Sequence, residues 1–301
     1  MQQLLSLLKI FYRAGYNLVH NDGLELSGYL TFLTLLGLFP FLVILVAGAG
    51  FIGQGEAGAQ FITLLITHLP AEVVQAVKPR IEEIISGPPQ GLLTVAILGA
   101  LWTSSSMVEG LRTVLNRAYK VSDPPIYIVR RLISMLQVIV FVVVIIVVMA
   151  VLLLTPLAFG MLEAKTGMRI PLEIQQFFSE DFIYLGGGLI LAGVASLYYW
   201  LPNIKQSLVH VVPGAALVVV LWVAGAGIVT YYLDHVGTVN IIYGSLSGFI
   251  ATLVFFYVMN LIFIYGAECN YQLKLSLGIK VEEREHSPIS SDTQVIRNDK
   301  K

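Results

Sequence analysis

Charged residues are scarce in this sequence, and their scarcity excludes an ordinary soluble domain. Only 12% of the 301 residues are Asp, Glu, Lys or Arg, whereas soluble domains carry about 25%. Hydrophobic residues make up 56% of the chain, and the mean hydropathy is +0.80. The sequence therefore predicts a membrane protein. The formal net charge of −1 says little about partners.

Paired cysteines, clustered histidines and nucleotide-binding glycine motifs are also missing. The single cysteine, Cys269, excludes an internal disulfide and a C-x-x-C motif. No P-loop or G-x-G-x-x-G is present, and Gly-Ser-Leu-Ser-Gly at 244–248 has Leu246 where a nucleophile elbow requires serine. No two histidines form an i, i+3 or i, i+4 pair, which disfavours a metallohydrolase. We therefore expect no cofactor, no bound metal and no enzymatic activity. The histidines are His20, His68, His210, His235 and His286.

Long apolar runs are what the sequence does contain. A membrane-spanning helix needs about 20 mostly apolar residues, and six stretches qualify, the second ending in the polar run Thr103 to Ser106. No stretch alternates as a barrel strand does. The predicted fold class is all-α: a polytopic membrane protein with six transmembrane helices, an N-terminal interfacial helix, an amphipathic external segment and an amphipathic cytoplasmic helix. The predicted spans lie near 27–52, 91–108, 132–159, 182–201, 209–233 and 244–272.

Two segments outside the spans have amphipathic patterns. In residues 1–22 leucines and Phe11 recur at helical spacing while Lys9 and Arg13 lie on another face, which predicts a helix on the membrane surface. The alternative is a solvated helix packed on a neighbour. Residues 53–90 also have a helical apolar period, broken at Pro70. This external segment either caps the mouth of the bundle or packs on its surface.

The basic residues predict the orientation. With the N-terminus inside, four basic residues fall on the outer side, namely Lys78, Arg80, Lys165 and Arg169, and the others fall inside. This asymmetry follows the positive-inside rule, so both termini are expected in the cytoplasm. We expect three parts: an interfacial helix at 1–22, a six-helix membrane domain at 23–275 and a disordered cytoplasmic tail at 276–301.

Polar residues collect at the predicted inner ends of the spans. Span two continues into an amphipathic helix in which Glu109, Arg112 and Asn116 share one face. In the last span, Glu268 lies at the same predicted depth, where an unpaired carboxylate is expensive. We expect Glu268 to be ionised and held by Arg112, Arg130 or Arg131. The pair is either a structural clip between spans or part of a transport site.

A cleft is expected near Pro40, where a proline inside a span frees backbone groups. Large apolar bundles enclose ligand sites of this kind, lined by aromatic and a few polar side chains. The candidate lining residues are Tyr29, Phe39, Pro40, Trp102, Tyr257 and Asn260.

Three stretches of the chain resemble the YihY/BrkB family of bacterial inner-membrane proteins. They are LSGYLTFLTLLGLFPFLVIL at 26–45, ALWTSSSMVEGLRTVLNRAYKV at 100–121 with the following Arg130-Arg131, and NIIYGSLSGFIATLVFFYVMNLIFIYGAECN at 240–270. The resemblance implies a six-helix protein of the bacterial inner membrane with cytoplasmic termini and no settled activity. Its historical ribonuclease label is generally regarded as a misassignment. This chain departs from the family's small residues at Met107-Val108-Glu109.

Two classes of function remain open. One is a transporter or exporter of a lipid-like, amphipathic or anionic solute, supported by Pro40 and Pro156 within spans and by Gly186-Gly187-Gly188. The other is a non-transporting scaffold in envelope biogenesis. A membrane ribonuclease is disfavoured. The expected partners are membrane lipids and a small amphipathic or anionic substrate, with no nucleic acid.

Overall fold

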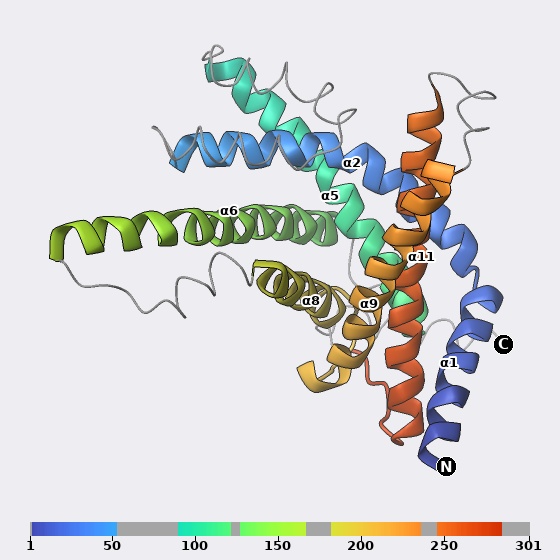
Figure 1. Ribbon diagram of the computed structural model, residues 1–301. Helices are drawn as coiled ribbons and strands as arrows, with labels where there is room; N and C mark the ends of the chain where they lie inside the picture. The colour runs from blue at the N-terminus through green and yellow to red at the C-terminus, as the bar shows by residue number, and fades with distance from the viewer. Residues whose placement is uncertain (1, 53–89, 122–126, 167–181, 236–245, 285–301) are drawn as a thin grey trace.

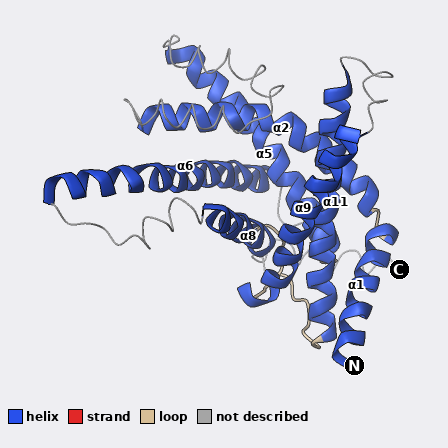
Figure 2. Cartoon of the chain, in the orientation of Figure 1, coloured by secondary structure: helices blue, strands red, loops and turns tan. Residues whose placement is uncertain are grey.

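The computed structural model describes residues 2–52, 90–121, 127–166, 182–235 and 246–284. The regular secondary structure in these ranges is helical, which confirms the all-α class (Figure 2). The predicted external segment lies outside the described residues, apart from its last position. The helices are α1 (Gln2–His20), α2 (Gly23–Ile52), α5 (Gln90–Ala118), α6 (Tyr127–Thr166), α8 (Phe182–Trp200), α9 (Leu208–His235) and α11 (Ser247–Ser276).

Four of the described helices are long and apolar enough to cross a membrane: α2, α6, α9 and α11. Helix α5 is continuous from the predicted second span into the predicted cytoplasmic helix, and its second half carries Glu109, Arg112 and Arg117. The chain is thus a helical membrane protein. The finer six-span arrangement stays a prediction.

Helix α1 packs along α11 with one face and is exposed on the other. Ala14 is fully buried, and the Tyr265 hydroxyl donates to the Phe11 carbonyl oxygen at 3.2 Å. Tyr12 and Tyr16 are exposed on the opposite face. Packing on a neighbour is therefore observed, while contact of the exposed face with the membrane surface stays a prediction.

The buried core is one cluster with side chains from all seven described helices, and part of it lies where α5, α9, α11 and the α8–α9 connection come together. Helices α2, α6 and α8 extend from this region to one side, and α1 and the C-terminal half of α11 extend to the other (Figure 1). This is the end of the bundle that carries the predicted cytoplasmic basic residues. The buried side chains here include Val114, Leu115, Ile204, Val211, Ala215 and Ala267.

Helices α9 and α11 cross at close range through two glycines. A Cβ atom on Gly214 would come within 2.4 Å of the Gly266 carbonyl oxygen, so no side chain fits there. Pro213 lies inside α9 and cannot donate a helical hydrogen bond. At this point Asn270 Oδ1 accepts the Gly214 amide at 2.7 Å and Asn270 Nδ2 donates to the Val211 carbonyl at 3.0 Å. The crossing is therefore fixed by both close packing and a side-chain amide.

Residues 277–284 correct the prediction of a disordered tail that starts at 276. Helix α11 ends at Ser276. Gly278, two residues later, has a φ of 70°, and the Ile279 amide donates to the Lys274 carbonyl at 3.0 Å. Glu283 then forms an isolated antiparallel bridge with Ile204, and the Arg284 guanidinium donates to the Tyr199 carbonyl at 2.8 Å. The unsatisfied carbonyls at the end of α8 attract this cation, a contact that composition does not reveal. Residues 285–301 lie outside the described residues.

Replacing Gly214 by alanine should destabilise the protein by about 1–3 kcal/mol, the usual cost of overpacking, because the added methyl meets backbone on α11. Gly227→Ala on the same helix is the matched control, since no described heavy atom lies within 4 Å of its Cβ position. Thermal unfolding in detergent measures both. Equal stability of the two variants would contradict the close crossing.

Candidate functional site: a buried charge network between α5 and α6

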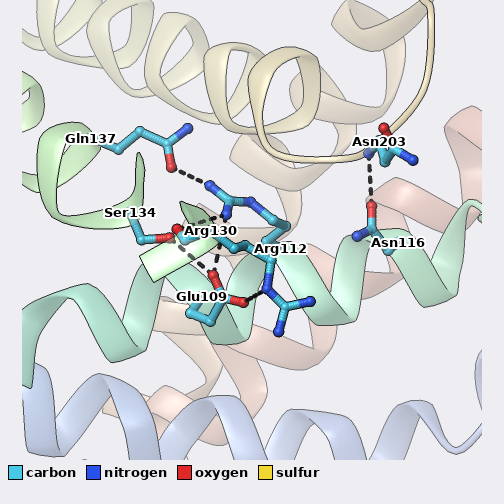
Figure 3. Close-up of polar contacts among 7 residues, drawn as sticks. All are labelled: Glu109, Arg112, Asn116, Arg130, Ser134, Gln137 and Asn203. Carbon is cyan, nitrogen blue, oxygen red and sulfur yellow. Dashed lines mark hydrogen bonds and ion pairs between the residues drawn. The ribbon is translucent and has the colours of Figure 1, made fainter. Parts of the chain in front are cut away.

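Glu109 on α5 is the centre of a buried ion-pair network. Its Oε2 atom lies 3.2 Å from Arg112 Nη1, one turn along the same helix, and Oε1 forms an ion pair with Arg130 of α6. The Ser134 hydroxyl donates to Oε2 at 3.0 Å (Figure 3). One buried carboxylate is thus shared by two arginines from neighbouring helices.

Arg112 extends the network along α6. Its guanidinium donates to Gln137 Oε1 at 2.5 Å and to the Arg130 carbonyl oxygen at 3.3 Å. Ser134 and Gln137 were not among the predicted site residues. Their signal was present, because they lie four and seven residues after Arg130 in an otherwise apolar part of α6. Spacing on that helix could therefore have identified them.

Asn116 belongs to a separate contact on the same helix. Its Oδ1 atom accepts the backbone amide of Asn203 at 2.7 Å, which joins α5 to the connection between α8 and α9. Figure 3 shows this pair apart from the Glu109 group. Asn203 was also missed, and nothing in its local sequence distinguishes it from an ordinary loop residue.

Arg131 points to a different neighbour from Arg130. Its guanidinium lies over the Trp102 ring, 4.5 Å from the centroid, and donates to the Trp102 carbonyl oxygen and to the Ser106 hydroxyl, the latter at 2.9 Å. Arg131 itself is buried, whereas Trp102 is 54% exposed. The tryptophan ring therefore covers a buried cation at the surface of the bundle.

Glu268 corrects the prediction that an arginine holds it. It is 1% exposed, and its oxygens accept hydrogen bonds from Asn17 Nδ2 at 3.5 Å and Asn21 Nδ2 at 3.4 Å. Among the described residues no ion pair reaches it. The reason is that Asn17, on α1, and Asn21, in the turn directly after it, lie against α11, so amides occupy the place expected for an arginine.

Lys274 and Tyr119 form a second buried polar contact that the sequence did not predict. Lys274 Nζ donates to Gln206 Oε1 at 3.0 Å and lies 5.8 Å from the centroid of the Tyr119 ring. Burial raises the pKa of the Tyr119 phenol above its ordinary value, so this hydroxyl stays protonated at neutral pH. These residues tie the end of α5 and the α8–α9 connection to α11.

The six residues expected to line a cleft are spread over three helices. Asn260 Nδ2 donates to the Thr31 hydroxyl at 3.3 Å, which joins α11 to α2. Helix α2 runs through Pro40 without interruption. A common cleft stays a prediction. Tyr29, Phe39 and Trp102 are exposed and Tyr257 is half-buried.

In the described part of the chain, no group of three or more His, Cys, Asp and Glu side chains could hold a metal ion. The chemistry that the network offers is instead that of guanidinium, hydroxyl and amide groups. These groups bind anions and polar headgroups through hydrogen bonds and charge, with no covalent bond formed.

The fold and the network define a polytopic α-helical membrane protein with a charge network buried between two of its helices. The chain belongs to the family described as virulence factor BrkB, whose sequence profile matches residues 14–289. This confirms the resemblance noted above. No solved structure matches the chain.

Relatives in several bacteria match most or part of the chain. YfkH of Bacillus subtilis, described as ribonuclease-like, is 26% identical over 83% of this chain and 90% of its own length. A UPF0761 membrane protein of Tolumonas auensis is 35% identical over 28% of this chain and 30% of its own length. Another, of Alkalilimnicola ehrlichii, is 25% identical over 81% of this chain and 54% of its own length.

Glu109→Gln should reduce the free energy of unfolding by about 3–5 kcal/mol, because it leaves the buried Arg112 and the half-buried Arg130 without their shared carboxylate. Glu25→Gln, an exposed position on α2, is the control and should change stability little. The free energy of unfolding or the thermal midpoint in detergent measures both. A Glu109→Gln protein as stable as the control would show that the network does not hold α5 to α6.

Glu268→Gln should destabilise the protein much less than Glu109→Gln does. Its free energy of unfolding should stay within about 1 kcal/mol of that of the parent protein. Glutamine keeps an oxygen that accepts from Asn17 or Asn21, and the change leaves no buried arginine without a counter-charge. The same unfolding measurement compares the two variants. A larger loss for Glu268→Gln would instead indicate that its negative charge holds α1 in place.

Proposed function

We propose that this protein is a transporter or exporter of a lipid-like, amphipathic or anionic solute. The observation that supports it is one face of α5. Val95, Leu98 and Trp102 are 70%, 61% and 54% exposed, and the same face continues to Ser106 and the buried Glu109. An apolar track thus ends at a polar network.

An amphipathic molecule matches this arrangement. Its apolar part would lie along the exposed residues of α5, where the bilayer supplies it, and its polar end would reach the guanidinium and hydroxyl groups. Ionisable groups inside a membrane bundle commonly mark substrate or ion pathways. The proposal places the protein in the bacterial inner membrane with both termini in the cytoplasm.

The surface of helix α8 supports the entry of a substrate into the bundle from the side, through the bilayer. No described heavy atom lies within 4 Å of the Cβ positions of Gly186, Gly187, Gly188 and Gly193. Among the described residues α8 packs chiefly on α9, whereas α6 packs on α5 and α2. The proposal involves no covalent chemistry and no nucleic acid.

Purified protein in liposomes tests the proposal with two fluorescent probes, a labelled phosphatidylglycerol and a labelled fatty acid. We expect protein-dependent movement between leaflets for at least one probe, measured by quenching the label from outside. Trp102→Ala should slow it about tenfold, the effect of losing roughly 1.4 kcal/mol of differential binding.

Trp200→Ala is the matched control, because this tryptophan of α8 is 51% exposed and lies away from the α5 track. It should leave the rate unchanged. Absence of protein-dependent movement for both probes would reject transport and favour a scaffold in envelope biogenesis.

A further inference from the structure

The buried ionisable side chains are not equally neutralised. Arg112 and Arg130 share the carboxylate of Glu109. Arg131 forms no ion pair with any described carboxylate, and its Nε atom is buried without a hydrogen-bond partner. A buried donor without a partner is costly, and a buried guanidinium with no counter-charge is more so.

Lys274 also has no carboxylate partner among the described residues, but it differs from Arg131 in position. Its ammonium group is held by Gln206 inside the junction of α5, α11 and the α8–α9 connection. Arg131 is instead covered by the half-exposed ring of Trp102. Of the two cations, Arg131 is therefore the one that the bilayer can reach when a single side chain moves.

The surroundings of Arg131 have two chemically distinct parts. On the polar side is the Ser106 hydroxyl, 2.9 Å from Arg131 Nη2, and the half-exposed Trp102 ring covers the guanidinium. On the apolar side are Leu98, which precedes Trp102 on the same face of α5, and the exposed Leu132, which follows Arg131 on α6. We call Leu98, Trp102, Ser106 and Arg131 the α5–α6 seam.

The depth of the seam suits a lipid headgroup. Arg131 immediately precedes the predicted third span, and Trp102 lies within about 9 Å of the inner end of the predicted second span, at 1.5 Å per residue. Tryptophan is enriched at this level of the membrane, and basic sites between helices on the cytoplasmic side bind anionic headgroups.

We propose that the α5–α6 seam binds the phosphate of an anionic phospholipid. The planar guanidinium of Arg131 matches a phosphate with two parallel hydrogen bonds. The phosphate accepts from Nε, which has no partner now, and from Nη2, which now donates to the Ser106 hydroxyl. An acyl chain then lies along Leu98 and Val95. The assignment names the substrate class of the proposed transport site and rests on that function.

The test is binding of lipid to the full chain in detergent, followed by native mass spectrometry. Phosphatidylglycerol, phosphatidylcholine and inorganic phosphate are titrated separately. We expect phosphatidylglycerol to bind at least tenfold more tightly than phosphatidylcholine, and Arg131→Gln to reduce this affinity about tenfold. Arg117→Gln is the control, because Arg117 is exposed at the same end of the bundle and pairs with Asp22. It should bind the lipid as the parent does.

If Arg131→Gln does not fold, Arg131→Lys, which keeps the positive charge, is tested in its place. It should bind phosphatidylglycerol more weakly than the parent, because an ammonium group lacks the planar fork. Equal binding of both phospholipids, equal affinities of the Arg131 and Arg117 variants, or saturation by inorganic phosphate without preference for lipid would each overturn the assignment.

The failure of this site and the failure of transport are distinguishable. If lipid binds at Arg131 but the protein moves neither probe, the binding site is supported and the transport function is rejected. If Arg131→Gln abolishes lipid binding but leaves the movement of labelled phosphatidylglycerol unchanged, the protein is a transporter and the seam is not its substrate site.

Discussion

The arrangement of α5 and α6 depends on the neutralisation of one buried carboxylate. Glu109 accepts two guanidinium groups and a hydroxyl from three residues, and each group is taken out of water. Such a network stabilises only when all its members are present, because any one of them alone would be a buried charge or an unmatched donor. The polar residues at the start of α6 therefore have to face α5.

Other polar contacts between helices gather at the same end of the bundle. Asn116 binds the α8–α9 connection, Asn270 binds the backbone of α9, and Lys274 binds Gln206. Arg284 adds a contact from the C-terminal segment to the carbonyls that end α8. In an apolar solvent, hydrophobic burial gives little preference for one helix arrangement over another. Directional polar contacts and the Gly214–Gly266 approach supply that preference here.

Glu109 and Glu268 are two buried carboxylates that are stabilised in different ways. Both are buried acids on apolar helices at the predicted inner end of the bundle. Glu109 is held by cations, and Glu268 by the amide groups of Asn17 and Asn21. The difference bears on function. A carboxylate whose oxygens are already paired with arginines holds helices together and leaves those arginines less available to an external anion. The cation left without a carboxylate at the bundle surface, Arg131, is then the one suited to an external anion.

The sequence by itself determined the solvent, the helical class and most helix positions, because these follow from composition and from apolar runs along one segment. The predicted span at 182–201 corresponds to Phe182–Trp200, and that at 209–233 to Leu208–His235. It also predicted one polar cluster of six residues, of which the structure joins Glu109, Arg112 and Arg130 and separates Asn116, Arg131 and Glu268. Only the tertiary structure decided which group each buried charge meets. Depth along a helix can be counted from residues, but the direction of a side chain around the helix selects its neighbour. Because of that direction, Glu268 contacts asparagines 251 and 247 residues earlier in the chain, and Arg131 contacts Trp102.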